Sequence, residues 1–174
     1  MSISSVESAV FRETKTTFNL ESYEEDKLAL VWLIKQTKTH INIYSHTLSP
    51  MVFNTEAIIL ACEQFCLKNH TTKIQIIINE DRPITRISHR LLGLSHRHSS
   101  SIFFKKINPD ISLREDDFVC FDKSAYFQLP NHQHYSGVCN FADADRTARF
   151  LSFFNDAWDR SETDPELRSM SLWA

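Results

Sequence analysis

A dense group of basic residues occupies positions 82–106 of the sequence. Several of them recur at intervals of three, four or seven residues, which places them along one side of an α-helix. These candidates are Arg86, His89, Arg90 and Arg97. Because arginine binds phosphate and carboxylate groups through paired hydrogen bonds, the pattern is compatible with an anion or nucleic-acid site. It is also typical of a solvated helix face, and His89 alone would suit a buried residue bonded to a strand end.

Polar residues at the ends of two expected strands form a second candidate site. Ser45 and His46 end one apolar run, and Asp122 ends another. In open α/β sheets ligands bind at the carboxyl ends of strands, so Ser45 and Asp122 are candidate ligand-binding residues. A Ser-His-Asp hydrolase is one interpretation. Against it, neighbouring residues of a strand point to opposite faces, and no Gly-x-Ser-x-Gly turn is present. Asp122 would then cap or hydrogen-bond a neighbouring loop.

Two His-x-His pairs and four cysteines are potential metal ligands. The pairs are His96 with His98 and His132 with His134, a spacing that puts both rings on one face of a strand. Neither pair has an evident third ligand, and the first falls near a helix end, where the two rings diverge. The cysteines are Cys62, Cys66, Cys120 and Cys139. We expect them to be reduced and to act as small buried apolar side chains. The sequence thus predicts no metal site and no cofactor.

Composition limits the classes of protein to which the chain can belong. Its 174 residues suffice for one domain with a hydrophobic core, 42% of them are hydrophobic, and the net charge is −3. The two glycines exclude a glycine-rich phosphate loop, and the overall charge does not attract nucleic acid. No apolar run approaches the ~20 residues of a membrane span, and the first residues lack the pattern of a secretion signal. We therefore expect a cytoplasmic protein without membrane contact, for which nucleic acid is not the favoured partner.

Hydrophobic periodicity predicts an alternation of helices and strands. Helices are expected at 22–39, 52–69, 83–98 and 143–160, and strands at 15–20, 41–45, 73–78, 101–106, 117–122, 125–129 and 137–141. This order predicts an α/β fold with a mixed, largely parallel central sheet and helices on both faces. We interpret residues 21–174 as a single domain and residues 1–20 as an N-terminal arm that is partly disordered. Near the end of the chain, we expect Trp173 to dock on the domain.

Three stretches make the chain resemble one half of a phospholipase D superfamily protein. They are IYSHTLSP, KIQIIINE and the late strand DFVCFD. The motif of that superfamily is His-x-Lys, four further residues and Asp, followed by Gly-Ser-x-Asn. When the motif is aligned on Asp122, its His position holds Glu115 and its Lys position holds Asp117. Further on, Gly137 to Asn140 resembles Gly-Ser-x-Asn, with valine in place of serine, which makes Asn140 another candidate ligand-binding residue.

A closer resemblance is to an uncharacterised bacterial family. Its members share an HRLLxL helix, a Ser-Ser-x-Ile strand, a Gly-x-x-Asn-Phe turn and a Trp-x-Arg-Ser ending. The corresponding segments here are residues 89–94, 100–102, 137–141 and 158–161. This likeness spans residues 25–172 and implies a fold, but it implies no known reaction.

The likeness to phospholipase D proteins has a chemical consequence. Catalysis in that superfamily resembles nucleophilic attack by His, with Lys stabilising the phosphate charge. Glu115 and Asp117 remove the nucleophile and place two carboxylates where a phosphate would lie. We therefore expect a catalytically degenerate domain without catalytic residues, which acts in binding or regulation with an unidentified protein partner. The alternatives are an anion or nucleic-acid binder that uses residues 82–106, and a hydrolase with altered chemistry.

The resemblance also bears on assembly. Phospholipase D-type enzymes resemble two similar halves packed face to face, and short members pair as homodimers. A single half would leave that face open, and the chain has 13 Phe and three Trp for a small interior. We therefore predict a homodimer joined along the face that holds Asp122 and Asn140. The alternative is a monomer in which residues 127–136, which look inserted, or the C-terminal tail cover that face.

Overall fold

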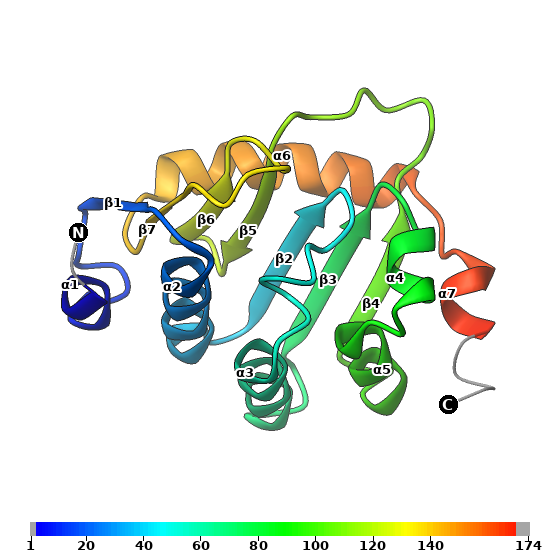
Figure 1. The fold of residues 1–174 in the computed structure, drawn as a ribbon, viewed down its shortest axis with the longest axis horizontal. Coiled ribbons are helices and arrows are strands. Elements are labelled where there is room, and N and C mark those ends of the chain that lie inside the picture. The colour runs from blue at the N-terminus through cyan, green and yellow to red at the C-terminus, as the bar shows by residue number, and fades with distance from the viewer. Residues whose placement is uncertain (1–2, 170–174) are drawn as a thin grey trace.

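A seven-stranded sheet forms the centre of the structure, a computed structural model that describes residues 3–169 (Figure 1). Its strands are β1 (Thr17–Leu20), β2 (His40–Ser45), β3 (Lys73–Ile78), β4 (Ile102–Lys106), β5 (Asp117–Phe121), β6 (Ala125–Leu129) and β7 (Gly137–Asn140). They lie side by side in the order β1-β7-β6-β5-β2-β3-β4. The predicted α/β fold with a mixed sheet is therefore confirmed.

Strand direction divides the sheet into two parts. The pairs β2–β3 and β3–β4 are parallel, whereas every pair from β1 to β2 in the spatial order is antiparallel. Five strands thus run in one direction, and β5 and β7 run in the other. Fewer neighbours are parallel than we expected, because the short turn 122–124 joins β5 to β6 and permits only antiparallel pairing.

These directions give the sheet two chemically different edges. The carboxyl ends of β2, β3, β4 and β6 meet the amino end of β5 at one edge, which we call the carboxyl edge. The opposite edge, where β2 begins and β5 ends, is the amino edge.

Helices cover both faces of the sheet, as predicted. The helices α2 (Tyr23–Gln36), α3 (Glu56–Leu67) and α5 (Arg90–Arg97) lie on one face, and α6 (Ala144–Arg160) lies on the other (Figure 1). Side chains of β2 alternate between two cores, with Ile41 and Ile43 toward the three helices and Tyr44 toward α6. In β3 the run Ile76 to Ile78 is buried throughout, as its unbroken apolar sequence predicts.

Polar caps begin the two longest helices. The Ser22 hydroxyl accepts a hydrogen bond from the Glu25 backbone N–H at 3.1 Å, and the Asp143 carboxylate accepts one from the Arg146 N–H at 3.0 Å. Each bond satisfies a backbone donor that has no partner within its helix. These caps explain why α2 and α6 start within one residue of the predicted positions.

The helix expected over residues 83–98 is two helices in the structure. α4 (Arg82–Arg86) ends before Ser88, whose φ of 50° is left-handed, and α5 begins after His89. The His89 Nδ1 atom accepts a hydrogen bond from the Leu91 N–H at 3.1 Å and so caps α5. Neither glycine nor proline marks this break. The predicted basic residues therefore do not follow one continuous helix.

Both terminal segments pack on the domain where they are described. The N-terminal helix α1 (Ile3–Glu7) and the following turn bury Val6 and Ala9, and the Trp32 indole donates to the Ala9 carbonyl at 3.0 Å. At the other end, α7 (Pro165–Ser169) buries Leu167. Trp173 lies outside the described residues. Within residues 3–169, no helix has both the length and the hydropathy needed to cross a membrane.

Candidate functional site

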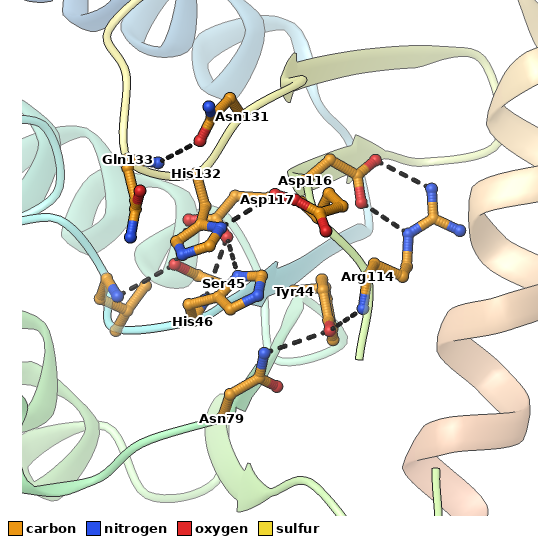
Figure 2. Close-up of polar contacts among 12 residues, drawn as sticks. Tyr44, Ser45, His46, Asn79, Arg114, Asp116, Asp117, Asn131, His132 and Gln133 are labelled. Atoms are coloured by element: carbon orange, nitrogen blue, oxygen red, sulfur yellow. Dashed lines mark hydrogen bonds and ion pairs between the residues drawn. The ribbon is translucent and has the colours of Figure 1, made fainter. Parts of the chain in front are cut away.

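Polar side chains lie buried at the carboxyl edge, where β2 and β5 are neighbours (Figure 2). Antiparallel pairing sets Tyr44 opposite Phe118, so Ser45 at the end of β2 comes next to Asp117 at the start of β5. Ser45 is fully buried and Asp117 is 3% exposed. A carboxylate in such a place needs hydrogen bonds to offset the loss of hydration.

Donors from the end of β2 supply those hydrogen bonds. The Ser45 hydroxyl donates to Asp117 Oδ2 at 2.6 Å, while the His46 backbone N–H and ring Nδ1 contact Oδ1 at 3.0 and 2.8 Å. The Ser45 oxygen in turn accepts from the Leu48 N–H at 2.9 Å. Leu48 has a left-handed φ of 50°, so this network holds a strained turn after β2.

The imidazole rings of His46 and His132 stack on each other. Their centroids are 3.6 Å apart, and the ring planes differ by 8°. The His132 backbone N–H and ring Nδ1 contact the Glu115 carbonyl oxygen at 3.1 and 2.9 Å, which holds loop 130–136 over the site. Because a carbonyl oxygen only accepts, the His132 Nδ1 atom carries a proton in this contact. Within the described part of the chain, no hydrogen bond engages Nε2 of either ring.

A second buried carboxylate, Asp116, pairs with Arg114. Two guanidinium nitrogens donate to its oxygens at 2.7 and 2.8 Å, and the Gln128 amide donates at 2.8 Å. Burial opposes ionisation of Asp116, but these hydrogen bonds outweigh it and hold its pKa below the usual value. The guanidinium also lies over the Phe118 and Phe153 rings, at 5.2 and 5.0 Å. Arg114 is therefore engaged within the domain.

Tyr44 completes the buried layer beneath the two histidines. Its hydroxyl accepts hydrogen bonds from the Asn79 amide and the Arg114 backbone N–H, both at 3.2 Å. Burial raises the pKa of Tyr44, so its phenol stays protonated at neutral pH. Asn79 is 8% exposed, and its side-chain oxygen has no hydrogen-bond partner among the described residues.

The arrangement orients His46 but forms no Ser-His-Asp triad. A carboxylate on Nδ1 fixes both the ring orientation and the proton position, as it does for histidines that act in acid–base chemistry. The Ser45 hydroxyl donates to Asp117 instead of to His46, however, so no base activates it as a nucleophile.

Asp122 lies at the amino edge, away from Ser45. The reason is that β5 runs antiparallel to β2, so its last residues neighbour the start of β2. The Asp122 carboxylate accepts hydrogen bonds from three backbone N–H groups and one hydroxyl of the segment Lys38–His40, at 2.8 to 3.0 Å. The interpretation of Asp122 as a residue that bonds a neighbouring loop is confirmed, and its grouping with Ser45 is wrong.

Asn140 is also at the amino edge, where its side chain stabilises the pairing of β7 with the outermost strand, β1. Its amide N–H donates to the Lys15 carbonyl at 3.0 Å and to the Thr17 hydroxyl at 3.2 Å, which ties β1 to β7. Asn140 is 3% exposed. The structure thus places Asn140 at the same edge as Asp122, with which the sequence grouped it, and away from Ser45.

The candidates in the basic segment divide into exposed and buried residues. Arg86, Arg90 and Arg97 are exposed on α4 and α5. His89 is 1% exposed, and its Nε2 atom lies 3.1 Å from the Leu48 carbonyl oxygen. Burial lowers the pKa of His89 to about 4, so the ring is neutral at physiological pH. His89 therefore joins α5 to the turn after β2 and cannot contribute charge to an anion site.

The remaining candidate metal ligands do not converge in the structure. His96 Nε2 contacts the Leu167 carbonyl oxygen at 2.9 Å, and His98 contacts Glu63 at 3.4 Å. Among the described residues, no group of three or more His, Cys, Asp and Glu side chains could hold a metal ion. All four cysteines are buried as free thiols, and burial raises the pKa of Cys62 to about 12.

Sequence reasoning missed two contacts of this site, between His46 and Asp117 and between His46 and His132. The motif alignment did draw attention to Asp117, but only as a charge that would repel phosphate. Which strand lies beside β2 decides the partners of Asp117, and hydrophobic periodicity does not encode strand order.

Solved structures of low sequence identity share this fold. Nuc from Salmonella typhimurium, described as a phospholipase D family member, has a TM-score of 0.62 and 16% identity, over 86% of this chain and 97% of Nuc. NucT from Helicobacter pylori has a TM-score of 0.56 and 12% identity, over 86% of this chain and 98% of NucT. The archaeal chromatin protein TrmBL2 has a TM-score of 0.60 and 12% identity over 89% of this chain, which spans 57% of TrmBL2. At these identities the likeness shows the fold alone.

Sequence comparison identifies the family. Among curated proteins, none matches this chain in sequence. Residues 22–170 match a family described as a domain of unknown function, DUF7931. The match covers most of the chain, and the resemblance to an uncharacterised family with a phospholipase D-like fold is thereby confirmed. The chain belongs to the DUF7931 family.

Proposed function

We propose that this phospholipase D-like domain lacks phosphodiesterase activity and acts as a binding or regulatory module. One observation carries the proposal. Asp117, which aligns with the lysine of the superfamily motif, is a buried carboxylate that already accepts hydrogen bonds from Ser45 and His46. A lysine would attract a phosphate, whereas carboxylate oxygens repel it, most strongly in a site that excludes water.

Hydrolysis of bis-p-nitrophenyl phosphate by the purified full chain tests this proposal. We expect p-nitrophenolate release at the rate of the buffer control. The variant His46→Ala provides the matched sample, because it removes the imidazole that the Asp117 carboxylate orients. Turnover that follows the protein through two columns and disappears in His46→Ala would reject the proposal and favour a hydrolase with altered chemistry.

We also propose that the chain forms a homodimer. Three large apolar side chains are exposed on loops that begin or end at the carboxyl edge: Met51 (57%), Leu113 (58%) and Tyr135 (47%). Monomeric proteins rarely expose large contiguous apolar patches, and these three side chains lie on loops at one edge of the sheet. This distribution favours an interface at the carboxyl edge over the Asp122–Asn140 face that the sequence suggested.

Light scattering coupled to size exclusion at micromolar concentrations tests the dimer. We expect twice the chain mass of 20.3 kDa for the wild type and a shift toward monomer for Leu113→Ser combined with Tyr135→Ser. The control is Leu67→Ser, because Leu67 is 68% exposed but lies at the end of α3 that precedes β3, toward the amino edge. A mass near 20.3 kDa at every concentration would reject the dimer.

A second candidate function is nucleic-acid binding through the exposed arginines of α4 and α5. Arg86, Arg90 and Arg97 form no ion pair with acidic side chains among the described residues. In addition, TrmBL2, which shares the fold, is described as a chromatin protein with a novel mode of DNA binding. Against this function, Lys106 pairs with Asp81 at 3.5 Å, and the net charge of the chain is negative.

Fluorescence anisotropy with a labelled DNA duplex and a labelled single strand separates this function from the first. Binding through phosphate contacts weakens steeply with salt, and replacement of three arginines lowers the salt dependence. If Arg86, Arg90 and Arg97 bind DNA, we expect the affinity of the wild type to fall steeply with salt and that of the triple variant to fall less steeply. Equal anisotropy for wild type and Arg86→Gln/Arg90→Gln/Arg97→Gln at low salt would exclude this face as the binding surface.

A further inference from the structure

A cavity of about 470 Å³ opens at the amino edge, on the face of the sheet that α6 covers. Its lining comes from the segment before β1, the starts of β2 and β3, the turn between β5 and β6, and the middle of α6. A cavity of this size falls in the range of small-molecule sites. It lies at the opposite end of β2 from His46 and is therefore separate from the carboxyl-edge site.

Two amide side chains form the floor of the cavity. Tyr44 and Ile77 pack beneath α6, but the preceding residues on the same face are Asn42 and Gln75. The Asn42 amide donates to the Gln75 side-chain oxygen at 3.0 Å, and Asn42 is only 5% exposed. This bond leaves the Asn42 oxygen and the Gln75 amide N–H groups for another partner. Neither of these groups is among the buried polar atoms that lack a partner, so a ligand in the cavity can reach both.

Three cations surround this floor. Arg12, Lys38 and Lys123 come from separate segments and line the cavity. None of them pairs with an acidic side chain in the described part of the chain. The one carboxylate in the lining, Asp122, is occupied by the hydrogen bonds that cap β2. Three cations against one carboxylate leave the cavity lining with an excess of positive charge.

The conformation of Arg12 adds an independent indication. Its φ of 69° is left-handed, a conformation that costs energy for any residue with a side chain. The Arg12 backbone N–H donates to the Phe141 carbonyl at 2.8 Å, and its Nε donates to the Ser124 hydroxyl at 3.2 Å. These two bonds hold the guanidinium at the cavity. Strained residues of this kind are concentrated at functional sites.

We propose that this cavity binds a small organic anion. A phosphate or carboxylate group of the ligand lies among Arg12, Lys38 and Lys123, and a polar part of the ligand hydrogen-bonds to Asn42 and Gln75. Both acidic groups match the donor geometry of arginine. The site does not depend on the proposed function of the carboxyl edge, since the two lie at opposite ends of β2.

Isothermal titration of the full chain with three probes tests the site: AMP, inorganic phosphate and citrate. AMP and phosphate report a phosphate ligand, and citrate reports a carboxylate ligand. The test variant is Arg12→Gln/Lys38→Gln/Lys123→Gln, in which all three side chains are exposed, so the fold should persist. The control is Lys35→Gln/Arg149→Gln/Arg160→Gln, which removes the same charge from exposed positions outside the cavity lining. A further variant, Gln75→Leu, changes the floor without changing charge.

We expect at least one probe to bind the wild type and the control equally, and the test variant at least about tenfold more weakly, since the loss of even one charge-assisted contact costs roughly one power of ten in affinity. Gln75→Leu should weaken AMP more than inorganic phosphate, because only AMP has a polar body over the floor. The proposal is overturned if no probe binds at millimolar concentration, or if the control variant loses as much affinity as the test variant.

Discussion

Asp26 is a buried acid whose ionisation should make the stability of the domain depend on pH. Its side chain is 0% exposed, and both carboxyl oxygens lack hydrogen-bond partners among the described residues. Burial first, and then the neighbouring charge of Glu25, raise its pKa from the usual 3.8 to about 8. The folded chain therefore keeps a proton that the unfolded chain releases above pH 4.

The sign and size of the effect follow from proton linkage. Between about pH 4 and pH 8 the folded state binds one more proton at Asp26 than the unfolded state does. The free energy of unfolding therefore falls by about 1.4 kcal/mol for each unit by which the pH rises. Below pH 4 both states are protonated, and above pH 8 both are ionised, so the contribution is flat outside this window. Replacement of Asp26 by Asn removes the titrating group at nearly constant volume, so it should remove this slope.

Urea unfolding followed by tryptophan fluorescence at pH 5, 6, 7 and 8 measures the slope. We expect the stability of Asp26→Asn relative to wild type to rise by about 1.4 kcal/mol for each pH unit, whatever the absolute cost of the amide. The exposed residue Asp145 on α6 provides the control, since Asp145→Asn should run parallel to wild type. If the free energies of unfolding of Asp26→Asn and wild type change in parallel with pH, Asp26 is ionised in the folded protein and the reasoning is refuted.

Three further substitutions have directions that the structure determines. Gly137→Ala should destabilise by about 1–3 kcal/mol in urea unfolding, because the new methyl would lie 2.6 Å from Asp26 Oδ1 and force repacking. By contrast, Gly93→Ala in α5 should raise the free energy of unfolding by about 0.5–1 kcal/mol, because the atom nearest to the new methyl is 3.8 Å away. A lower free energy of unfolding for this variant would contradict the prediction. Asp122→Ala should lower the midpoint of thermal unfolding at pH 7. Hydrogen bonds from residues 38–40 outweigh burial and depress the pKa of Asp122, so wild type and variant should converge as the pH falls below 4. An unchanged midpoint at pH 7 would exclude this capping role.

The accuracy of the sequence prediction depended on the range of the interaction involved. β3 and β6 begin and end at the predicted residues, since local periodicity and turn residues define them. The break between α4 and α5 escaped prediction, because a side-chain cap by His89 and a left-handed serine create it. The site at the carboxyl edge was predicted only in part. Ser45 lies there, but its partner Asp117 depends on strand order, which is a property of the whole chain.

The two edges of the sheet are connected by β2, and this connection determines how the domain can change over evolutionary time. At about 3.3 Å per residue, His46 lies roughly 20 Å along β2 from His40 and roughly 13 Å from Asn42, two residues that line the amino-edge cavity. Substitutions so far apart have additive effects on stability. Each edge can therefore acquire or lose a ligand without altering the other, and a family with this architecture can diversify its specificity at one edge while it inherits the other unchanged.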